Sequence, residues 1–139
     1  YIDYQVNKAI KNVKHQQGDV SEVHDELATG IATEVHHIFP KSQFPTIATY
    51  YENLILLTSS QHRQKAHPKG NTQVVSKDYQ LVCLMAKSQT IETSLNEGDN
   101  FYRKESFVGV INTGLTENLD EAISFADIRK FLVAKYLTF

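Results

Sequence analysis

The sequence predicts an α+β fold in which long helices flank a short segment of two strands and a helix. Apolar residues recur at helical spacing near the N-terminus and again over residues 76–95. Between them, residues 32–39 and 52–57 are short apolar segments with the character of strands. With 139 residues, of which 41% are hydrophobic and 22% charged, the chain is long enough for one domain with a core. We therefore expect a single domain over residues 1–139.

The composition also excludes several classes of protein. The chain has no run of about 18 apolar residues, so we expect no membrane span. The N-terminal residues lack the apolar centre of a signal peptide and do not begin with Met. We expect a cytoplasmic protein, and a chain that is a fragment or has been processed. Cys83 is the single cysteine, which excludes an internal disulfide and a zinc site built from cysteines, and we expect it to be buried and inert.

Residues 2–16 predict an amphipathic helix. Its apolar stripe consists of Ile2, Val6, Ala9, Ile10 and Val13. The lysines that lie away from this stripe are Lys8, Lys11 and Lys14. They form either a solvated face or a stripe that binds phosphate groups. Residues 17–31 are polar and predict a loop, with turns at Gly18 and Gly30.

The next segment predicts two strands and a helix in succession. Residues 32–39 form a short strand, and Pro40 prevents its continuation as a helix. Residues 52–57 form a second strand. A hydroxyl side chain at positions 58–60 then caps a short helix that ends near His67.

The C-terminal half predicts two helices with a strand between them. Residues 76–95 form a long helix that ends before Gly98. Residues 106–112 are a continuous apolar run, which we interpret as a strand followed by a turn at Gly114. The last helix begins at Ser124, where an acidic residue three positions later resembles a capping box.

Four of the six histidines lie in residues 34–67, namely His36, His37, His62 and His67. Adjacent histidines on a strand point to opposite faces. One imidazole can therefore bind a metal ion while its neighbour takes a proton from an attacking water molecule, a division that suits phosphodiester hydrolysis. Two adjacent histidines are equally consistent with a functional site and with partly buried polar residues that have backbone partners. A further histidine on the following helix favours a metal site.

This stretch resembles the HNH endonuclease family, the ββα-metal nucleases. The resemblance rests on EVHHIFPKS, ENLILLTSSQH and RQKAHP, about 35 residues or a quarter of the chain. It implies a ββα-metal core over about residues 30–70, elaborated by helical flanks at 1–16 and 76–139. It also implies that His36 and His62 bind the metal ion, that His37 is the general base, and that Asn53 orders the loop that carries the base. The family uses one divalent ion, usually Mg²⁺, and such histidine-rich sites also take Zn²⁺, Mn²⁺ or Ni²⁺.

The chain departs from the family pattern in two ways. It lacks the paired cysteine motifs that bind structural zinc in many members, so the flanking helices must hold the core. Some histidine-rich members have a last ligand four residues after the helical histidine, whereas His67 lies five residues after His62. In an α-helix this spacing turns His67 by roughly 140° from His62. Pro68 can unwind the helix end and return His67 to the ion; otherwise water or phosphate oxygens complete the shell.

The charges give a mixed indication about nucleic acid. A net charge of −2 argues against a strong stand-alone binder, because phosphate neutralisation supplies most of the affinity of such modules. Arg63 and Lys65 flank the helical histidine and Lys41 follows the pair, so each is either a phosphate contact or a solvated residue. The aromatic residues Tyr50 and Tyr51 predict core packing rather than base stacking.

The sequence therefore predicts a metal-dependent endonuclease that hydrolyses DNA, as the catalytic part of a restriction-type or similar larger enzyme. DNA is the expected substrate, with RNA left open, and a recognition domain or a homodimer partner would supply sequence recognition. The alternative is a non-catalytic, metal-stabilised DNA-binding module with an HNH-like fold.

Overall fold

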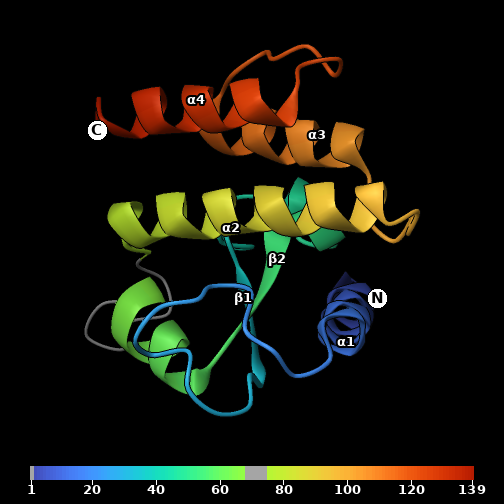
Figure 1. Cartoon of the computed structure of the whole chain (residues 1–139), viewed down its shortest axis with the longest axis vertical. Helices are drawn as coiled ribbons and strands as arrows, with labels where there is room; N and C mark the ends of the chain where they lie inside the picture. Colours follow the sequence, from blue (N-terminus) through green and yellow to red (C-terminus); the bar gives the residue numbers. More distant parts are fainter. Residues whose placement is uncertain (1, 68–74) are drawn as a thin grey trace.

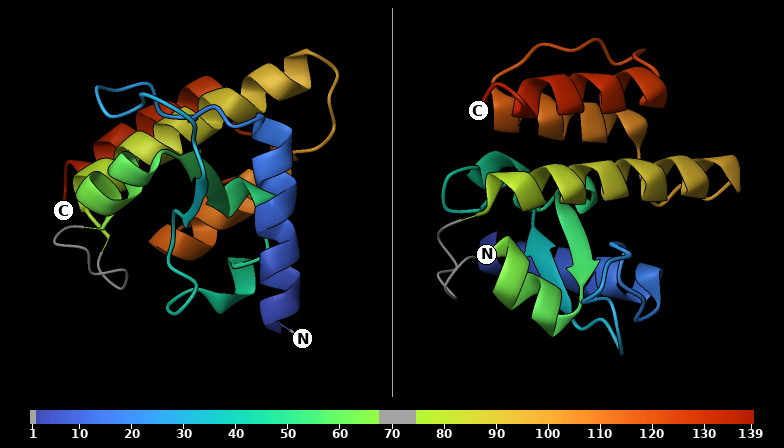
Figure 2. Two further views of the ribbon diagram at one scale, coloured as in Figure 1. Left: turned by 90° about the horizontal axis from the view of Figure 1, so that it is seen from below. Right: turned by 60° about the vertical axis from the view of Figure 1, so that its left-hand side comes forward.

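The computed structural model describes residues 2–67 and 75–139 and has an α+β architecture. Its main elements are α1 (Ile2–Gln17), β1 (Glu34–His37), β2 (Leu54–Leu57), α2 (Lys77–Asn96), α3 (Lys104–Leu115) and α4 (Phe125–Tyr136). Short helical segments between them are η1 (Pro45–Ile47), η2 (Tyr51–Asn53) and η3 (Gln61–Ala66). α2 lies between the α3–α4 pair and the sheet, while α1 and η3 lie on opposite sides of the sheet (Figure 1, Figure 2). Within the described ranges, no helix combines the length and apolar content needed to cross a membrane.

β1 and β2 lie within the two segments predicted as strands, each shorter than its predicted range, and form an antiparallel pair. The facing residues are Glu34–Leu57, Val35–Leu56, His36–Ile55 and His37–Leu54. Residues that face each other across the pair project to the same side of the sheet. Leu54 packs against α1 in a small cluster with Ala9, whereas Ile55 belongs to the main core. His37 therefore lies on the α1 side of the sheet and His36 on the side of the main core.

The predicted helices at 2–16, 76–95 and 124 onwards are confirmed. The Ser76 hydroxyl caps α2 by accepting a hydrogen bond from the Tyr79 backbone N–H at 3.3 Å. The Ser124 hydroxyl caps α4 in the same way, with 3.1 Å to the Asp127 N–H. In the apolar stripe of α1, Val6, Ala9 and Val13 are buried and Ile10 is partly buried, while the side chain of Ile2 lies outside the described part of the chain.

The prediction of a strand over residues 106–112 is wrong, and these residues lie in the middle of α3. Phe107, Ile111 and Leu115 are buried at helical spacing, and Val108 and Val110 are buried beside them. The helix is therefore buried on a broad face, and this is why the run is continuously apolar. A short apolar run does not distinguish a buried helix from a strand by its period.

Gly114, predicted as a turn, is also part of α3. A Cβ atom at this position would lie 2.4 Å from Cε1 of Phe39, so only glycine lets the helix approach the ring that closely. The contact packs α3 against the residues that follow β1.

A buried ion pair attaches the loop before β1 to the core. The Lys87 ammonium lies 3.0 Å from Oε1 of Glu22 and 2.9 Å from the Tyr102 hydroxyl, and the Lys87 side chain is fully buried. Oε2 of Glu22 accepts a hydrogen bond from the Leu56 N–H at 2.8 Å, and the Glu22 N–H donates to the Leu56 carbonyl at 3.0 Å. Burial favours neutral Lys87, but the charge of Glu22, the Tyr102 oxygen and the hydrogen bonds to both together outweigh it and raise the pKa of the ammonium. The loop is thereby held along β2.

Candidate metal centre

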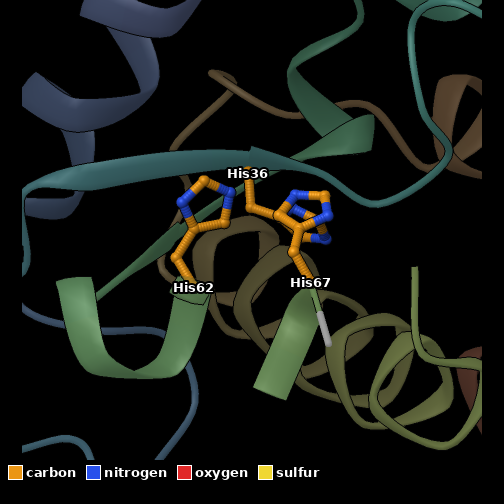
Figure 3. Close-up of side chains that lie close together, drawn as sticks. All are labelled: His36, His62 and His67. Atoms are coloured by element: carbon orange, nitrogen blue, oxygen red, sulfur yellow. The ribbon is translucent and has the colours of Figure 1, made fainter. Parts of the chain in front are cut away.

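Three histidines from separate parts of the chain converge beside the sheet (Figure 3). His36 comes from β1, His62 from η3, and His67 from the residue that ends η3. Their ring centroids lie 5.1 Å (His36–His62), 4.9 Å (His36–His67) and 4.7 Å (His62–His67) apart. One ring nitrogen of each lies within 4.8 Å of the other two. A metal ion bound by imidazoles at about 2.0–2.1 Å needs donors grouped in this way.

The environment of His36 fits a metal ligand. The residue is 2% exposed, and its Nε2 is a buried atom with no hydrogen-bond partner in the described part of the chain. Buried polar side-chain atoms almost always have a partner, so this nitrogen requires an explanation. Burial, and then the neighbouring His62, His67 and His37, hold the pKa of His36 well below its ordinary value. The imidazole is neutral at pH 7 and offers a lone pair, as a metal ligand must.

Glu34 fixes the orientation of His62. Its Oε1 lies 2.7 Å from Nδ1 of His62, and a carboxylate can only accept, so Nδ1 carries the proton. With Nδ1 committed to Glu34, Nε2 is the nitrogen through which the His62 imidazole can bind a cation. Burial raises the pKa of Glu34, but hydrogen bonds from His62 and Ser59 and the charge of Arg63 outweigh it, and the net shift is downward. A carboxylate behind a ligating histidine is a common arrangement in metal sites.

A wide helical turn brings His67 back beside His62. The backbone N–H of His67 donates to the carbonyl of His62 at 3.2 Å, and η3 is a π-helix in which hydrogen bonds span five residues. Such a bond places residue i+5 above residue i, as the four-residue bond does for i+4 in an α-helix. The expected rotation of His67 away from His62 is therefore absent. The proposed unwinding at Pro68 involves a residue outside the described part of the chain.

A reciprocal capping box fixes the helical residues 59–60 that lead into η3. The Thr58 N–H donates to Oε1 of Gln61 at 2.9 Å, and the Gln61 N–H donates to the Thr58 hydroxyl at 3.2 Å. The Gln61 amide also donates to the Val23 carbonyl at 2.8 Å and to Asp25 at 2.9 Å. The loop held by Glu22 thus supports the helix that carries His62.

His37 turns to the other face of the sheet, as adjacent strand residues do. Its Nε2 lies 2.9 Å from the Ala48 carbonyl oxygen, which can only accept, so Nε2 carries the proton and Nδ1 has the lone pair. Burial lowers the pKa of His37, and the charge of Lys41 lowers it further against the effect of the Ala48 hydrogen bond. A cavity of about 340 Å³ is lined by His37 and Lys41 together with the three clustered histidines.

Asn53 ties together the ends of the loop between the strands. It is fully buried; its Oδ1 accepts from the Phe39 N–H at 2.9 Å, and its Nδ2 donates to the carbonyls of Phe39 (3.0 Å) and Ile47 (3.3 Å). Ile47 precedes Ala48, whose carbonyl holds His37. Asn53 therefore acts on His37 through the loop and does not touch the cluster itself.

The three residues predicted to contact phosphate do not lie together at the histidine cavity. Lys41 lines the cavity of the histidines. Arg63 is largely exposed and lies 3.6 Å from Glu34. Lys65 is paired with Asp25 at 3.4 Å and with Glu26, so its ammonium is directed to the loop before β1 rather than to the cavity.

Glu34 was not among the predicted site residues, although the sequence contains a signal for it. Residues two apart on a strand share a face, so Glu34 had to lie on the side of His36. The residues that support η3 from the preceding loop have no comparable sequence signal, because they are about 35–40 positions away along the chain.

No model of a known protein family, no curated protein and no solved structure matches this chain. What the site can do follows from its own residues.

Proposed function

We propose that this protein is a metal-dependent endonuclease that hydrolyses phosphodiester bonds in DNA. The observation that supports the proposal is the arrangement of His36, His62 and His67, with His37 lining the same cavity from the neighbouring position on the strand. Three imidazole donors for a cation and a separate imidazole that can act as a base are the two groups that metal-assisted hydrolysis needs. The resemblance to the ββα-metal nucleases supports the same interpretation.

The donor set favours a transition-metal ion. Imidazole nitrogens suit Zn²⁺ and Ni²⁺, whereas Mn²⁺ and Mg²⁺ prefer oxygen ligands and Mg²⁺ retains several water molecules. Zn²⁺ or Ni²⁺ therefore fits the three histidines better than the Mg²⁺ expected from the resemblance. Bound there, the ion would polarise the phosphate and stabilise the leaving oxygen.

The protein groups supply the proton transfer and the positioning. The Ala48 carbonyl holds the Nε2 proton of His37, so Nδ1 is the atom that takes a proton from the attacking water molecule. The lowered pKa of His37 keeps this atom unprotonated at pH 7. Lys41 lines the cavity and attracts the phosphate, and Asn53 keeps the loop carrying Ala48 in place.

The test is nicking of supercoiled plasmid by the full chain with Zn²⁺, Ni²⁺, Mn²⁺ or Mg²⁺, with EDTA and His37→Ala as controls. We expect metal-dependent nicking by the wild type, and its loss in both controls. Metal content is measured on the same samples by mass spectrometry. Equal nicking by wild type and His37→Ala would overturn the role of His37, and a protein that binds no metal would overturn the site.

A second candidate is a non-catalytic DNA-binding module that uses the ion as a cross-link. It is favoured by the depth of His36 and by the net charge of −2, since an ion joining β1 to η3 would stabilise the fold without any reaction. This candidate would be selected if the protein binds metal stoichiometrically and melts at a higher temperature with metal, but does not cleave DNA with any of the four ions. In either case a recognition domain or a homodimer partner would provide the remaining affinity for DNA.

A further inference from the structure

A second cavity, of about 400 Å³, opens between α1, the segment before β2 and the loop before α3. We define it as the aromatic pocket, lined by Lys8, Asn12, Tyr50, Tyr51, Phe101 and Arg103 among others. Its volume is within the range of small-ligand sites, about 300–1,000 Å³. None of these residues belongs to the histidine cavity.

The pocket presents aromatic surface to solvent. Tyr51 and Phe101 are stacked, with ring centroids 4.4 Å apart and planes 6° from parallel, and the Tyr51 hydroxyl accepts a hydrogen bond from Asn12 at 3.0 Å. Tyr51 therefore packs against the core as predicted. Tyr50 does not, because it is 39% exposed. A rigid aromatic platform beside an exposed tyrosine is a surface on which a planar ring can stack.

Polar and charged groups surround the aromatic rings. Gln5 and Asn12 of α1 line the pocket with side-chain amides, which can both donate and accept hydrogen bonds. Lys8 is exposed at its edge, and the Arg103 guanidinium lies there too, held by Glu105 at 2.7 Å. Aromatic rings, amides and cations match the three parts of a nucleotide, namely the base face, the base edge and the phosphate.

The backbone links this pocket to His37, the proposed general base. His37 and Leu54 face the α1 side of the sheet, and Leu54 packs with Ala9, which lines the pocket. The Ala48 carbonyl holds His37, and the next residues, 49–52, line the pocket. One short segment, residues 48–52, therefore contacts both His37 and the pocket.

We propose that the aromatic pocket binds an unpaired nucleotide of the nucleic-acid substrate, with its base stacked on Tyr50 and the Tyr51–Phe101 platform. This proposal rests on the proposed function, because the nucleotide reaches the pocket as part of the strand held near the histidines. Such a site would give the enzyme a preference for single-stranded, flipped or distorted DNA.

The test uses the full chain in EDTA and a single-stranded 12-nucleotide DNA with 2-aminopurine at its centre. Fluorescence anisotropy measures affinity, and quenching of 2-aminopurine reports stacking. We expect Tyr50→Leu to weaken binding roughly 10-fold and to reduce the quenching, since stacking of one base contributes about 1–3 kcal/mol, or 5- to 150-fold. Lys8→Gln should weaken binding and lower the slope of log affinity against log salt by about 0.7.

Phe139→Leu and Lys130→Gln are the matched controls, because both residues are exposed near the C-terminus, outside the pocket. Both should bind as the wild type does, and thermal melts confirm that every variant is folded. Binding and quenching by Tyr50→Leu equal to the wild type, or no binding by the wild type, would overturn the pocket. Plasmid nicking by the wild type is scored separately, so the pocket and the nuclease can fail independently.

Discussion

The proton on Nδ1 of His62 is determined by one contact, the 2.7 Å hydrogen bond to Glu34. Glu34→Gln keeps an acceptor oxygen but removes the charge that orients the ring, so we expect metal affinity to fall about 10- to 100-fold. Isothermal titration with Zn²⁺ measures the change. Glu117→Gln is the matched control, because Glu117 pairs with Lys135 on the surface, at 3.0 Å. Equal affinity of Glu34→Gln and the control would contradict the role of Glu34.

Substitution of the proposed base, His37, and of a proposed metal ligand, His62, should have different effects on cleavage and metal binding. We expect His37→Ala to reduce the cleavage rate about 10²- to 10⁴-fold while metal affinity changes little, because its imidazole acts as a base. His62→Ala removes a ligand and should reduce both. Rates come from single-turnover cleavage and affinities from titration on the same preparations. A His37→Ala protein that loses its metal would show that His37 is a ligand instead.

At the scale of elements, two glycines of α3 provide a direct comparison. A Cβ at Gly114 would lie 2.4 Å from the Phe39 ring, whereas a Cβ at Gly109 would meet nothing within 4 Å. Gly114→Ala should lower the free energy of unfolding by about 1–3 kcal/mol through overpacking. Gly109→Ala should raise it by about 0.5–1 kcal/mol through helix propensity. Urea unfolding measures both, and a Gly114→Ala protein as stable as the wild type or more so would contradict the packing at Gly114.

Asp25 couples the loop before β1 to η3 and α2 in a pH-dependent way. Burial raises its pKa, but hydrogen bonds from Gln61, Leu27, Tyr79 and Lys65 outweigh this, and the folded pKa is below 3.8. A depressed folded pKa means that the stabilisation is fully present above the unfolded value, about 3.9, and is lost as the pH falls through the folded value. The free energy of unfolding should therefore be higher for the wild type than for Asp25→Asn. This difference should be largest at pH 5–7 and should shrink progressively below about pH 4. A difference that stays constant down to pH 2 would contradict this.

Much of the element order was predictable because it depends on local signals. The capped helices at Ser76 and Ser124 and the split of His36 and His37 across the sheet follow from spacing alone. The helical state of residues 106–112 does not, since tertiary burial on a broad face removes the period. The approach of His67 to His62 depends on a π-helical hydrogen bond, which the residue pattern does not encode.

At the scale of the whole molecule, a bound ion would join parts of the fold that lie far apart along the chain. β1 and η3 are separated along the chain by the loop and β2, and the histidines bridge them directly. With Zn²⁺ at about 100 times its dissociation constant, the free energy of unfolding should rise by about 2.7 kcal/mol. Calorimetry with Zn²⁺ and EDTA measures this rise, which should be absent in His62→Ala. An equal rise in that variant would place the ion elsewhere.

The π-helical turn also has a consequence for how sites of this kind are found. A search pattern that requires His-x₃-His, the α-helical repeat, rejects this chain because four residues separate His62 from His67. The widened turn nevertheless brings the same two imidazoles together. The number of residues between two ligands is thus set by the pitch of the local helix, and a pattern written for one pitch passes over chains that use another.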